Sequence, residues 1–339
     1  MTRRAAMFLK VLAALLSLHC AASAQPAPSP ASLAIRRGVN VLGYDGVWKG
    51  ETDAPFRMDD FRLIRAAGFD HVRINFFGLH FMDPKNRLDG EVLARLDRVL
   101  DAATAAGLSA VLDQHDNALC QQTPPACKEK IVAFWRQIAK RYAGARPRVV
   151  YEILNEPGGH MSAAEWNDAL AAALAEIRAA DPDRAVIVAA LNAGDVHDIE
   201  KLDIPPQDRN LIVTVHYYEP MRFTHQGAPW SSELASLRDV AWGAEESRRM
   251  VDDDFAVVAR WAAAQKRPIY LGEFGVYDSA PPLSRAAWMA HVAQTAQNHG
   301  WGWAYWQFDH DFALFDTASH GWKQPFLDAL MGAGAGDRR

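Results

Sequence analysis

The feature that most constrains the fold is a regular alternation of short apolar runs with longer helical stripes. The runs are rich in β-branched and aromatic residues and are bounded by turn residues, which is typical of buried strands. They cover Gly38–Leu42, Asp70–Phe76, Ser109–Gln114, Val149–Leu154, Ala185–Ala190, Leu211–His216, Pro268–Glu273 and Trp301–Trp306. Because the runs are apolar on both faces and are joined by short crossovers, the pattern predicts parallel strands.

The segments between these runs have the periodicity of amphipathic helices. Apolar residues recur at steps of three and four, which places each set on one helix face. The clearest stripes comprise Val92, Leu96, Val99 and Ala103; Ile131, Phe134, Trp135, Ile138 and Tyr142; and Trp166, Leu170, Leu174 and Ile177. Eight such strand–helix units predict an α/β fold of the (β/α)8 TIM barrel type. A doubly wound open sheet is the alternative, but the glycines from Gly38 to Gly46 lack the spacing of a phosphate-binding turn.

The first residues have the layout of a secretory signal peptide. Arg3, Arg4 and Lys10 precede the apolar run Val11–Leu18, and a small-x-small cleavage site ends at Ala24. The apolar run is too short to span a bilayer as a mature helix. We therefore expect a signal peptide over 1–24, a leader rich in Pro, Ala and Ser over 25–32, and a single catalytic domain over 33–336.

Composition excludes several classes of protein and partner. Half of the 339 residues are apolar and 23% are charged, which excludes a disordered or collagen-like chain. The 41 acidic residues outnumber the 36 basic ones, and the predicted signal peptide would remove only basic charges. An acidic chain argues against nucleic acid or an anionic membrane as a partner. We expect a neutral substrate and a monomer that is secreted or periplasmic.

Two cysteines, Cys120 and Cys127, remain after removal of the predicted signal peptide. An exported chain meets oxidising conditions, so a disulfide that closes the short loop between them is predicted. A metal-binding pair is the alternative, although no second Cys or His pair stands at zinc spacing. Cys20 suggests a lipoprotein, but His19 is bulkier than the small residue expected before a lipidated cysteine.

Polar residues gather where the predicted strands end, and this edge carries the active site in barrels of this type. Glu156 follows the fourth strand within Asn155-Glu156-Pro157, and Glu273 ends the seventh strand before Phe274-Gly275. Two carboxylates that face a shared substrate suit cleavage of a glycosidic bond. One carboxylic acid protonates the leaving oxygen, and the other group, as a carboxylate, contacts the oxocarbenium-like carbon.

These segments resemble glycoside hydrolase family 5, the cellulase family, from Arg37 to Trp306. The stretches His216–Pro220 and Phe223–Trp230 are similar to its endoglucanase branch. The resemblance implies a retaining mechanism without a cofactor or metal, with Glu156 as the acid/base and Glu273 as the nucleophile. It also implies that Arg73 and Tyr218 hold the nucleophile and that Asn155 binds the sugar 2-hydroxyl. His115 and His216 would line the site, and Trp306 would stack under the sugar. His225 and Trp230 would contact sugars further along the groove.

The expected electrostatics agree with these roles. An arginine near Glu273 favours the ionised form, while Glu156, which faces that charge in a partly desolvated cleft, should hold its proton longer. Together with the resemblance, the residues imply a retaining endo-β-1,4-glucanase that acts on a polysaccharide or oligosaccharide. A β-mannanase, a β-1,3-glucan hydrolase and a non-catalytic glycan-binding barrel are the alternatives.

Two features depart from the endoglucanase branch. Asp116 stands where many relatives have a second histidine, and the Cys120–Cys127 loop is distinctive. His115 has an alternative interpretation as a metal ligand with Asp113 and Asp116, but no further ligand is evident in the sequence. Asp116 and the Cys120–Cys127 loop both lie beside the expected cleft, so they bear on sugar preference.

Overall fold

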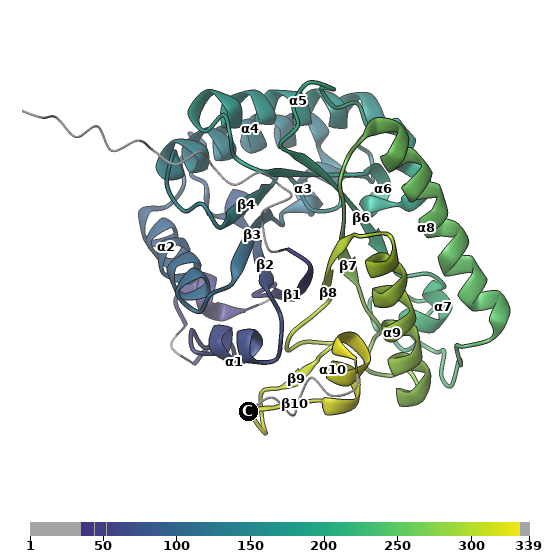
Figure 1. The fold of residues 1–339 in the computed structure, drawn as a ribbon. Coiled ribbons are helices and arrows are strands. Elements are labelled where there is room, and N and C mark those ends of the chain that lie inside the picture. The colour runs from purple at the N-terminus through teal and green to yellow at the C-terminus, as the bar shows by residue number, and fades with distance from the viewer. Residues whose placement is uncertain (1–34, 44, 52, 333–339) are drawn as a thin grey trace, which may run out of the picture.

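The computed structural model describes residues 35–43, 45–51 and 53–332 and contains a closed barrel of eight parallel strands in chain order (Figure 1). The strands are β1 (Arg37–Val41), β2 (His71–Phe76), β3 (Ser109–Gln114), β4 (Val149–Glu152), β5 (Val186–Ala189), β6 (Leu211–Tyr217), β7 (Ile269–Phe274) and β8 (Gly302–Tyr305). β8 pairs with β1 and closes the barrel. The predicted (β/α)8 fold is therefore confirmed, and every predicted strand is present with nearly the same bounds.

Helices surround the barrel on its outer face (Figure 1). They are α1 (Asp60–Ala66), α2 (Gly90–Ala105), α3 (Asn117–Gln122), α4 (Pro124–Tyr142), α5 (Ala163–Ala180), α6 (Leu191–Gly194), α7 (Met221–Thr224), α8 (Glu245–Gln265), α9 (Pro282–Asn298) and α10 (Gln324–Met331). Three 3-10 segments, η2 (Gly46–Lys49), η3 (Gly78–Phe81) and η4 (Val196–Lys201), and the short strands β9 (Phe315–Asp316) and β10 (Gly321–Trp322) lie in the connections.

The predicted helical stripes form the buried faces of α2, α4 and α5. Local signals fix where these helices begin. Ser162 and Glu165 form a capping box at the start of α5, which satisfies two otherwise unpaired backbone donors. Pro124 occupies the first position of α4, where the missing N–H costs nothing.

The interior of the barrel changes from apolar to polar along its axis. A separate apolar cluster fills the inside of the barrel and consists of Ile35, Val111, Val150, Ala185, Ile187, Ile212, Tyr270 and Ala304. Further along β2 and β3, Arg73 and Asp113 are buried and charged. Buried charges persist only when they are paired, so this end of the barrel is where functional side chains are expected.

The pairing of β6 with β7 contains one irregularity. Val215 pairs with Leu271 and His216 pairs with Glu273, so Gly272 is passed over. A Cβ at Gly272 would lie 2.5 Å from Oγ1 of Thr214. Such bulges redirect side chains near active sites, and this one stands directly before Glu273.

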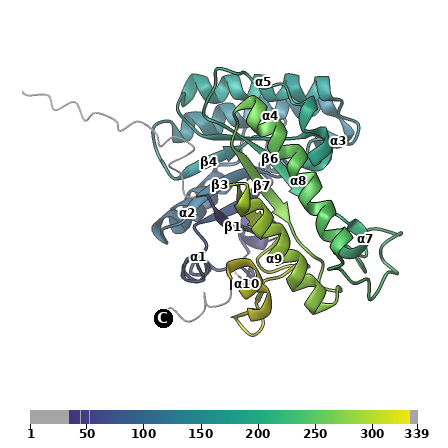
Figure 2. The ribbon, with the colours of Figure 1, turned by 45° about the vertical axis from the view of Figure 1, so that its right-hand side comes forward.

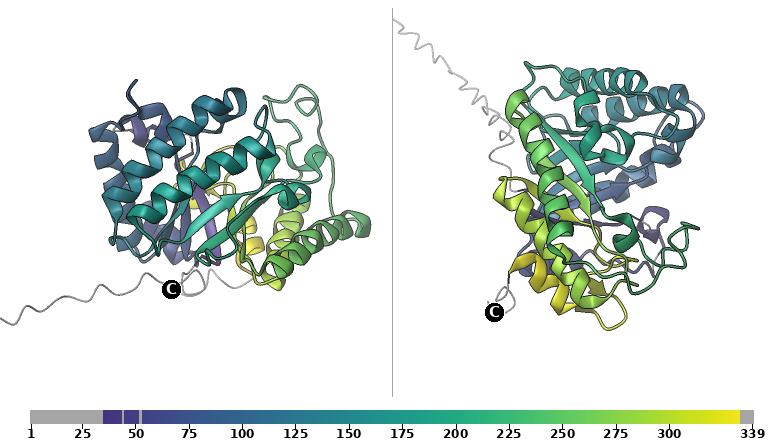
Figure 3. Two further views of the ribbon diagram at one scale, coloured as in Figure 1. Left: turned by 90° about the horizontal axis from the view of Figure 1, so that it is seen from above. Right: turned by 90° about the vertical axis from the view of Figure 1, so that its right-hand side faces the viewer.

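The connection from β6 to β7 contains α7 and the long helix α8, and its irregular part projects beyond the barrel (Figures 2 and 3). No helix among the described residues is both long and apolar enough to cross a membrane. The predicted signal peptide (1–24) and leader (25–32) lie outside the described residues, so they stay predictions. The same holds for the bounds 33–336 of the catalytic domain.

Candidate active site

A cleft of about 810 Å³ opens at the carboxyl ends of the strands. It brings together nearly all of the predicted site residues, namely His115, Asn155, Glu156, His216, Tyr218, His225, Trp230, Glu273 and Trp306. Arg73 is fully buried and is not among the residues that line the cleft. The placement at the strand ends agrees with the position of active sites in barrels of this type.

Glu273 is held by a positive charge and a hydroxyl. Nη1 of Arg73 donates to Oε1 at 2.6 Å, and the Tyr218 hydroxyl donates to Oε2 at 2.9 Å. Only 5% of the Glu273 side chain is exposed. Both predicted partners of Glu273, Arg73 and Tyr218, are therefore in place.

Arg73 also binds two carboxylates that lie deeper in the barrel. Its guanidinium makes a two-point contact with Glu152 at 2.8 Å and lies 3.1 Å from Asp113. Burial outweighs the attraction of Arg73 and raises the pKa of Glu152 to about 7. For Asp113, burial acts against ionisation, but Arg73 and His115 hold the pKa below its usual value.

Glu156 lies in the loop after β4 and has different surroundings. Its φ of +45° is in the left-handed region, which is rare for a residue that is not glycine. Nδ2 of Asn117 donates to Oε2, and Nε2 of Gln121 donates to the Glu156 carbonyl, both at 3.3 Å. Burial raises the pKa of Glu156, although 24% of its side chain is exposed. The pKa of Glu156 is thus raised, as expected, and burial is the leading cause. Among the neighbouring charges, His115 and Arg73 act against the increase, and Asp113 adds to it.

His216 lies between the two glutamates. Its Nδ1 is 3.0 Å from Oε1 of Glu156 and 3.6 Å from Oε2 of Glu273. Burial lowers the pKa of His216 to about 4, so the imidazole is neutral near pH 7. Nδ1 of a neutral imidazole can donate to an ionised Glu156 or accept from a protonated one, depending on the tautomer.

His115 and Trp306 form one wall of the cleft. Their rings are stacked with centroids 5.5 Å apart and planes 5° from parallel. Nδ1 of His115 is hydrogen-bonded to Asp113, whereas the Asp116 carboxylate accepts from the Leu79 N–H at 2.7 Å. His115, Asp113 and Asp116 therefore do not converge as the metal-site alternative requires.

Aromatic side chains continue the cleft away from Trp306. His225 packs edge to face against Tyr218 at 5.0 Å and against Phe312 at 5.4 Å. Trp230 lies beyond them with 56% of its surface exposed. Burial lowers the pKa of His225 to about 4, so it is neutral. A largely exposed indole at the end of a polar cleft suits the apolar face of a sugar ring.

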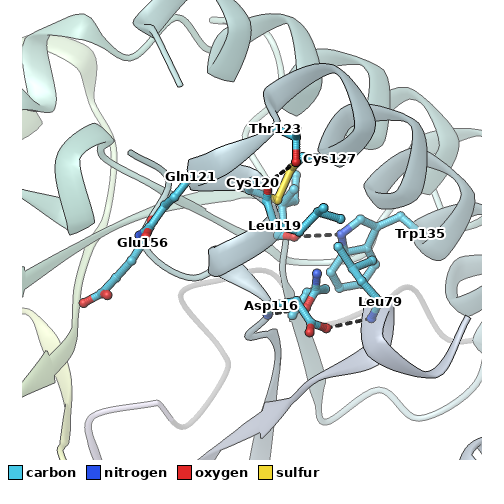
Figure 4. The surroundings of a disulfide bond; sticks show 11 residues. Leu79, Asp116, Leu119, Cys120, Gln121, Thr123, Cys127, Trp135 and Glu156 are labelled. Carbon is cyan, nitrogen blue, oxygen red and sulfur yellow. Dashed lines mark hydrogen bonds between the residues drawn. A yellow bond between two sulfur atoms is a disulfide. The ribbon is translucent and has the colours of Figure 1, made fainter. Parts of the chain in front are cut away.

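Cys120 and Cys127 form the predicted disulfide, which joins α3 to α4 beside Glu156 (Figure 4). Both cysteines are fully buried. The metal-pair alternative for these two residues is therefore wrong.

Within the described residues, Glu156, His216 and Glu273 are the one group of at least three carboxylate, imidazole or thiol side chains close enough to share a metal ion. Arg73 and Tyr218 already donate to both oxygens of Glu273. A guanidinium at 2.6 Å repels a second cation. The donor set therefore favours carboxylate chemistry, and we assign no metal to it.

Sequence reasoning missed several residues around the site. Asn40 and Glu152 bind Arg73 from β1 and β4. A charged residue inside the apolar run Val149–Leu154 was the available signal for Glu152, because a buried charge needs a partner. Asn117 and Gln121 reach Glu156 from α3, and no sequence signal marked them.

Comparisons with known proteins agree with this geometry. The family model described as Cellulase (glycosyl hydrolase family 5) matches residues 33–311. Endoglucanase H of Acetivibrio thermocellus is 27% identical over 299 residues, which cover 86% of this chain and 31% of that protein. Endoglucanase C of the same organism is 26% identical over an alignment 342 residues long, and the match covers 88% of this chain and 98% of that protein. The chain therefore spans about a third of the first relative and nearly all of the second.

Solved structures show the same relationship. Thermotoga maritima Cel5A, determined in complex with mannotriose, superposes with a TM-score of 0.82 at 32% sequence identity. The match covers 88% of this chain and 98% of the Cel5A chain. The barrel, the paired glutamates and the extent of the family match lead to one assignment: the chain is a glycoside hydrolase and belongs to glycosyl hydrolase family 5.

Proposed function

We propose that the chain is an exported, retaining endo-β-1,4-glucanase with Glu156 as the acid/base and Glu273 as the nucleophile. One observation carries the proposal, namely two carboxylates at one cleft in unequal surroundings. An oxygen of Glu156 and one of Glu273 lie within 4.8 Å of each other. That separation fits a retaining pair, at about 5–5.5 Å between carboxyl groups, better than an inverting pair at roughly 6.5–9.5 Å.

In the first step, a carboxylate oxygen of Glu273 attacks the anomeric carbon of the sugar. The bond from that carbon to the glycosidic oxygen breaks, and Glu156 gives its proton to the departing oxygen. The raised pKa of Glu156 supports this assignment, because the acid must be protonated when substrate binds. The products are a covalent ester on Glu273 and a shortened glycan with a free hydroxyl.

In the second step, water hydrolyses the ester. Glu156 is now ionised and takes a proton from water as the oxygen of that water attacks the anomeric carbon. The bond to Glu273 breaks, and its carboxylate returns to the donors on Arg73 and Tyr218. Two displacements at one carbon retain its configuration.

We assign the remaining cleft residues to sugar binding. Asn155 would bind the 2-hydroxyl beside the bond that is cleaved, and His115 would line the site. Trp306 would stack under the sugar, because an aromatic face matches the C–H face of a pyranose. His225 and the exposed Trp230 would contact sugar units further along the cleft.

The names of the relatives support β-1,4-glucan as substrate, since Endoglucanase H and Endoglucanase C align with most of this chain. β-Mannan is a second candidate. Cel5A, at 32% identity, has been solved both with mannotriose and with cellobiose. A cleft of this architecture can therefore accept either sugar in a relative, and measurement must decide for this chain.

Release of reducing ends from carboxymethylcellulose, lichenan, mannan and laminarin tests the proposal. We expect the greatest release from carboxymethylcellulose or lichenan, with the product configuration retained in proton NMR. Faster release from mannan would make the enzyme a mannanase. No release from any of the four would overturn the proposed function, and activity lost to a chelator would contradict the metal-free mechanism.

A further inference from the structure

We propose that α3 is a clamp helix, residues Asn117–Gln122, which holds Glu156 in place for proton transfer. Asn117 and Gln121 are its positioning residues, and the Cys120–Cys127 disulfide keeps the helix docked. The inference deepens the proposed function and rests on it, because positioning matters only if Glu156 moves a proton.

The clamp helix contacts Glu156 at both its side chain and its backbone. Asn117 and Gln121 are four residues apart, so they share one face of the helix. Nδ2 of Asn117 lies 3.3 Å from Oε2 of Glu156, and Nε2 of Gln121 lies 3.3 Å from its carbonyl oxygen. Figure 4 shows Gln121 directed from α3 toward Glu156. Each bond fixes a different part of one residue.

The loop after Glu156 is packed against the clamp helix as well. The Gln121 carbonyl accepts from the His160 N–H at 2.8 Å. Gly159 has a φ of +64°, and a Cβ there would lie 2.7 Å from Cβ of Gln121. On the other side, the Ala193 N–H donates to the Pro157 carbonyl at 3.1 Å. A left-handed φ at a residue such as Glu156 persists only where neighbours impose it, and these contacts supply that constraint.

The clamp helix itself needs anchors, because six residues are too few for a stable helix in isolation. At its start, the Asp116 carboxylate accepts from the Leu79 N–H at 2.7 Å. Near its end, Cys120 is bonded to Cys127 of α4 (Figure 4). Asp116 and the disulfide are the two departures from the endoglucanase branch noted in the sequence. Both secure the helix that holds Glu156.

Asn117 supplies an uncharged donor in a crowded electrostatic setting. The titratable and charged groups that face Glu156 are Arg73 from β2, Asp113 from β3, His115 directly after β3, His216 from β6, Tyr218 directly after β6, and Glu273 from β7. A hydrogen bond to the carboxylate favours its ionised form. Loss of the Asn117 donor should therefore raise the pKa of Glu156 and leave its carboxyl group less well aligned.

The test uses two aryl β-cellobiosides. A 2,4-dinitrophenyl group leaves without acid assistance, whereas a 4-methoxyphenyl group needs a proton. We expect Asn117→Ala and Gln121→Ala to lower kcat/KM, which reports the first chemical step, by about tenfold on the poor leaving group and by at most about twofold on the activated one. For Asn117→Ala, the alkaline limb of kcat/KM should move up by roughly half to one pH unit. The double variant Cys120→Ser/Cys127→Ser should show a smaller loss with the same dependence on leaving group.

Gln122→Ala is the matched control, because Gln122 lies in the same helix with an exposed side chain. Circular dichroism and thermal melting establish that each variant is folded. If Asn117→Ala unfolds, Asn117→Asp replaces the donor by a negative charge and should move the alkaline limb further upward. Equal losses on both substrates with an unmoved pH profile would overturn the clamp alone. Failure of the wild-type enzyme to cleave either cellobioside would overturn the proposed function and the clamp with it.

Discussion

The two glutamates of the cleft are held in opposite ways. Glu273 belongs to strand β7, is 5% exposed at its side chain and receives donors from a guanidinium and a hydroxyl. Glu156 lies in a loop with a left-handed backbone and receives uncharged donors from a neighbouring helix. A nucleophile must stay ionised, so a fixed positive charge suits it. An acid/base must gain and lose a proton, so supports without charge suit it better.

The supports of the two glutamates also differ in how much free energy their removal should cost. Arg73 is buried with three carboxylates, and removal of one partner from a buried charged network is usually costly. The support of Glu156 is built from hydrogen bonds and backbone packing, each worth about 1 kcal/mol. We therefore expect the residues that hold Glu273 to be rigid and intolerant of substitution. The residues that hold Glu156 should tolerate substitution with smaller losses.

The largest effect should come from Glu273→Ala. Loss of the nucleophile removes the covalent step, so we expect turnover of a soluble β-glucan to fall by roughly 10⁴-fold or more. Steady-state kinetics with Glu200→Ala, an exposed glutamate, as the control measure this. Activity within about tenfold of the wild type would end the assignment of Glu273.

Glu156→Ala should cost less, because it removes proton transfer and leaves the nucleophile. We expect a loss of roughly 10²–10⁴-fold on oligosaccharides. The pH profile gives a second measure. Since the acid must be protonated, wild-type kcat/KM should fall as pH rises through the raised pKa of Glu156. That alkaline limb should be absent in Glu156→Ala, and its persistence would assign the limb to another group.

Tyr218→Phe should have an intermediate effect, since it removes one of the two donors to Glu273. A hydrogen bond to a charged group is worth about 1.5–3 kcal/mol, so we expect kcat to fall by roughly 10- to 100-fold. Tyr142→Phe is the matched control, because the Tyr142 hydroxyl donates to Asp97 away from the cleft. An equal loss in both variants would indicate a general effect on stability.

Asp116→Asn should have the smallest effect, and on stability. Burial raises the pKa of Asp116 from 3.8 to about 6. Ionisation of this group therefore destabilises the folded protein as pH rises through that interval. Asparagine avoids this cost and can still accept from the Leu79 N–H. The variant should gain about 1 kcal/mol above pH 6 after allowance for solvent screening. Urea unfolding at pH 4 and pH 8 measures the difference, and an equal change at both values would contradict this origin.

Much of this site could be predicted from the sequence. Apolar runs that end in polar residues are enough to predict a barrel and to place Glu156 and Glu273 at one rim. The contacts of Glu273 with Arg73 and Tyr218 were expected, and both are present. The resemblance to family 5 implied these contacts, and the structure places Arg73 within β2 and Tyr218 directly after β6.

The rest depends on packing that no local pattern encodes. Asn117 and Gln121 reach Glu156 only because α3 lies over the loop after β4. Glu152 stands out as a charged residue in an apolar run, but its partner could not be assigned, because Arg73 is distant along the chain. A partly desolvated cleft was expected to raise the pKa of Glu156, but that burial is the leading cause depends on how several loops meet.

The extra residue in β7 limits how this enzyme can be diversified. Gly272 lies directly before Glu273, and any side chain there would collide with Oγ1 of Thr214. A substitution at this position would force Thr214 to move and would press on His216, whose Nε2 would lie 3.1 Å from the new Cβ. Directed evolution toward other glycans should therefore spare β7 and concentrate on the surface around the exposed Trp230.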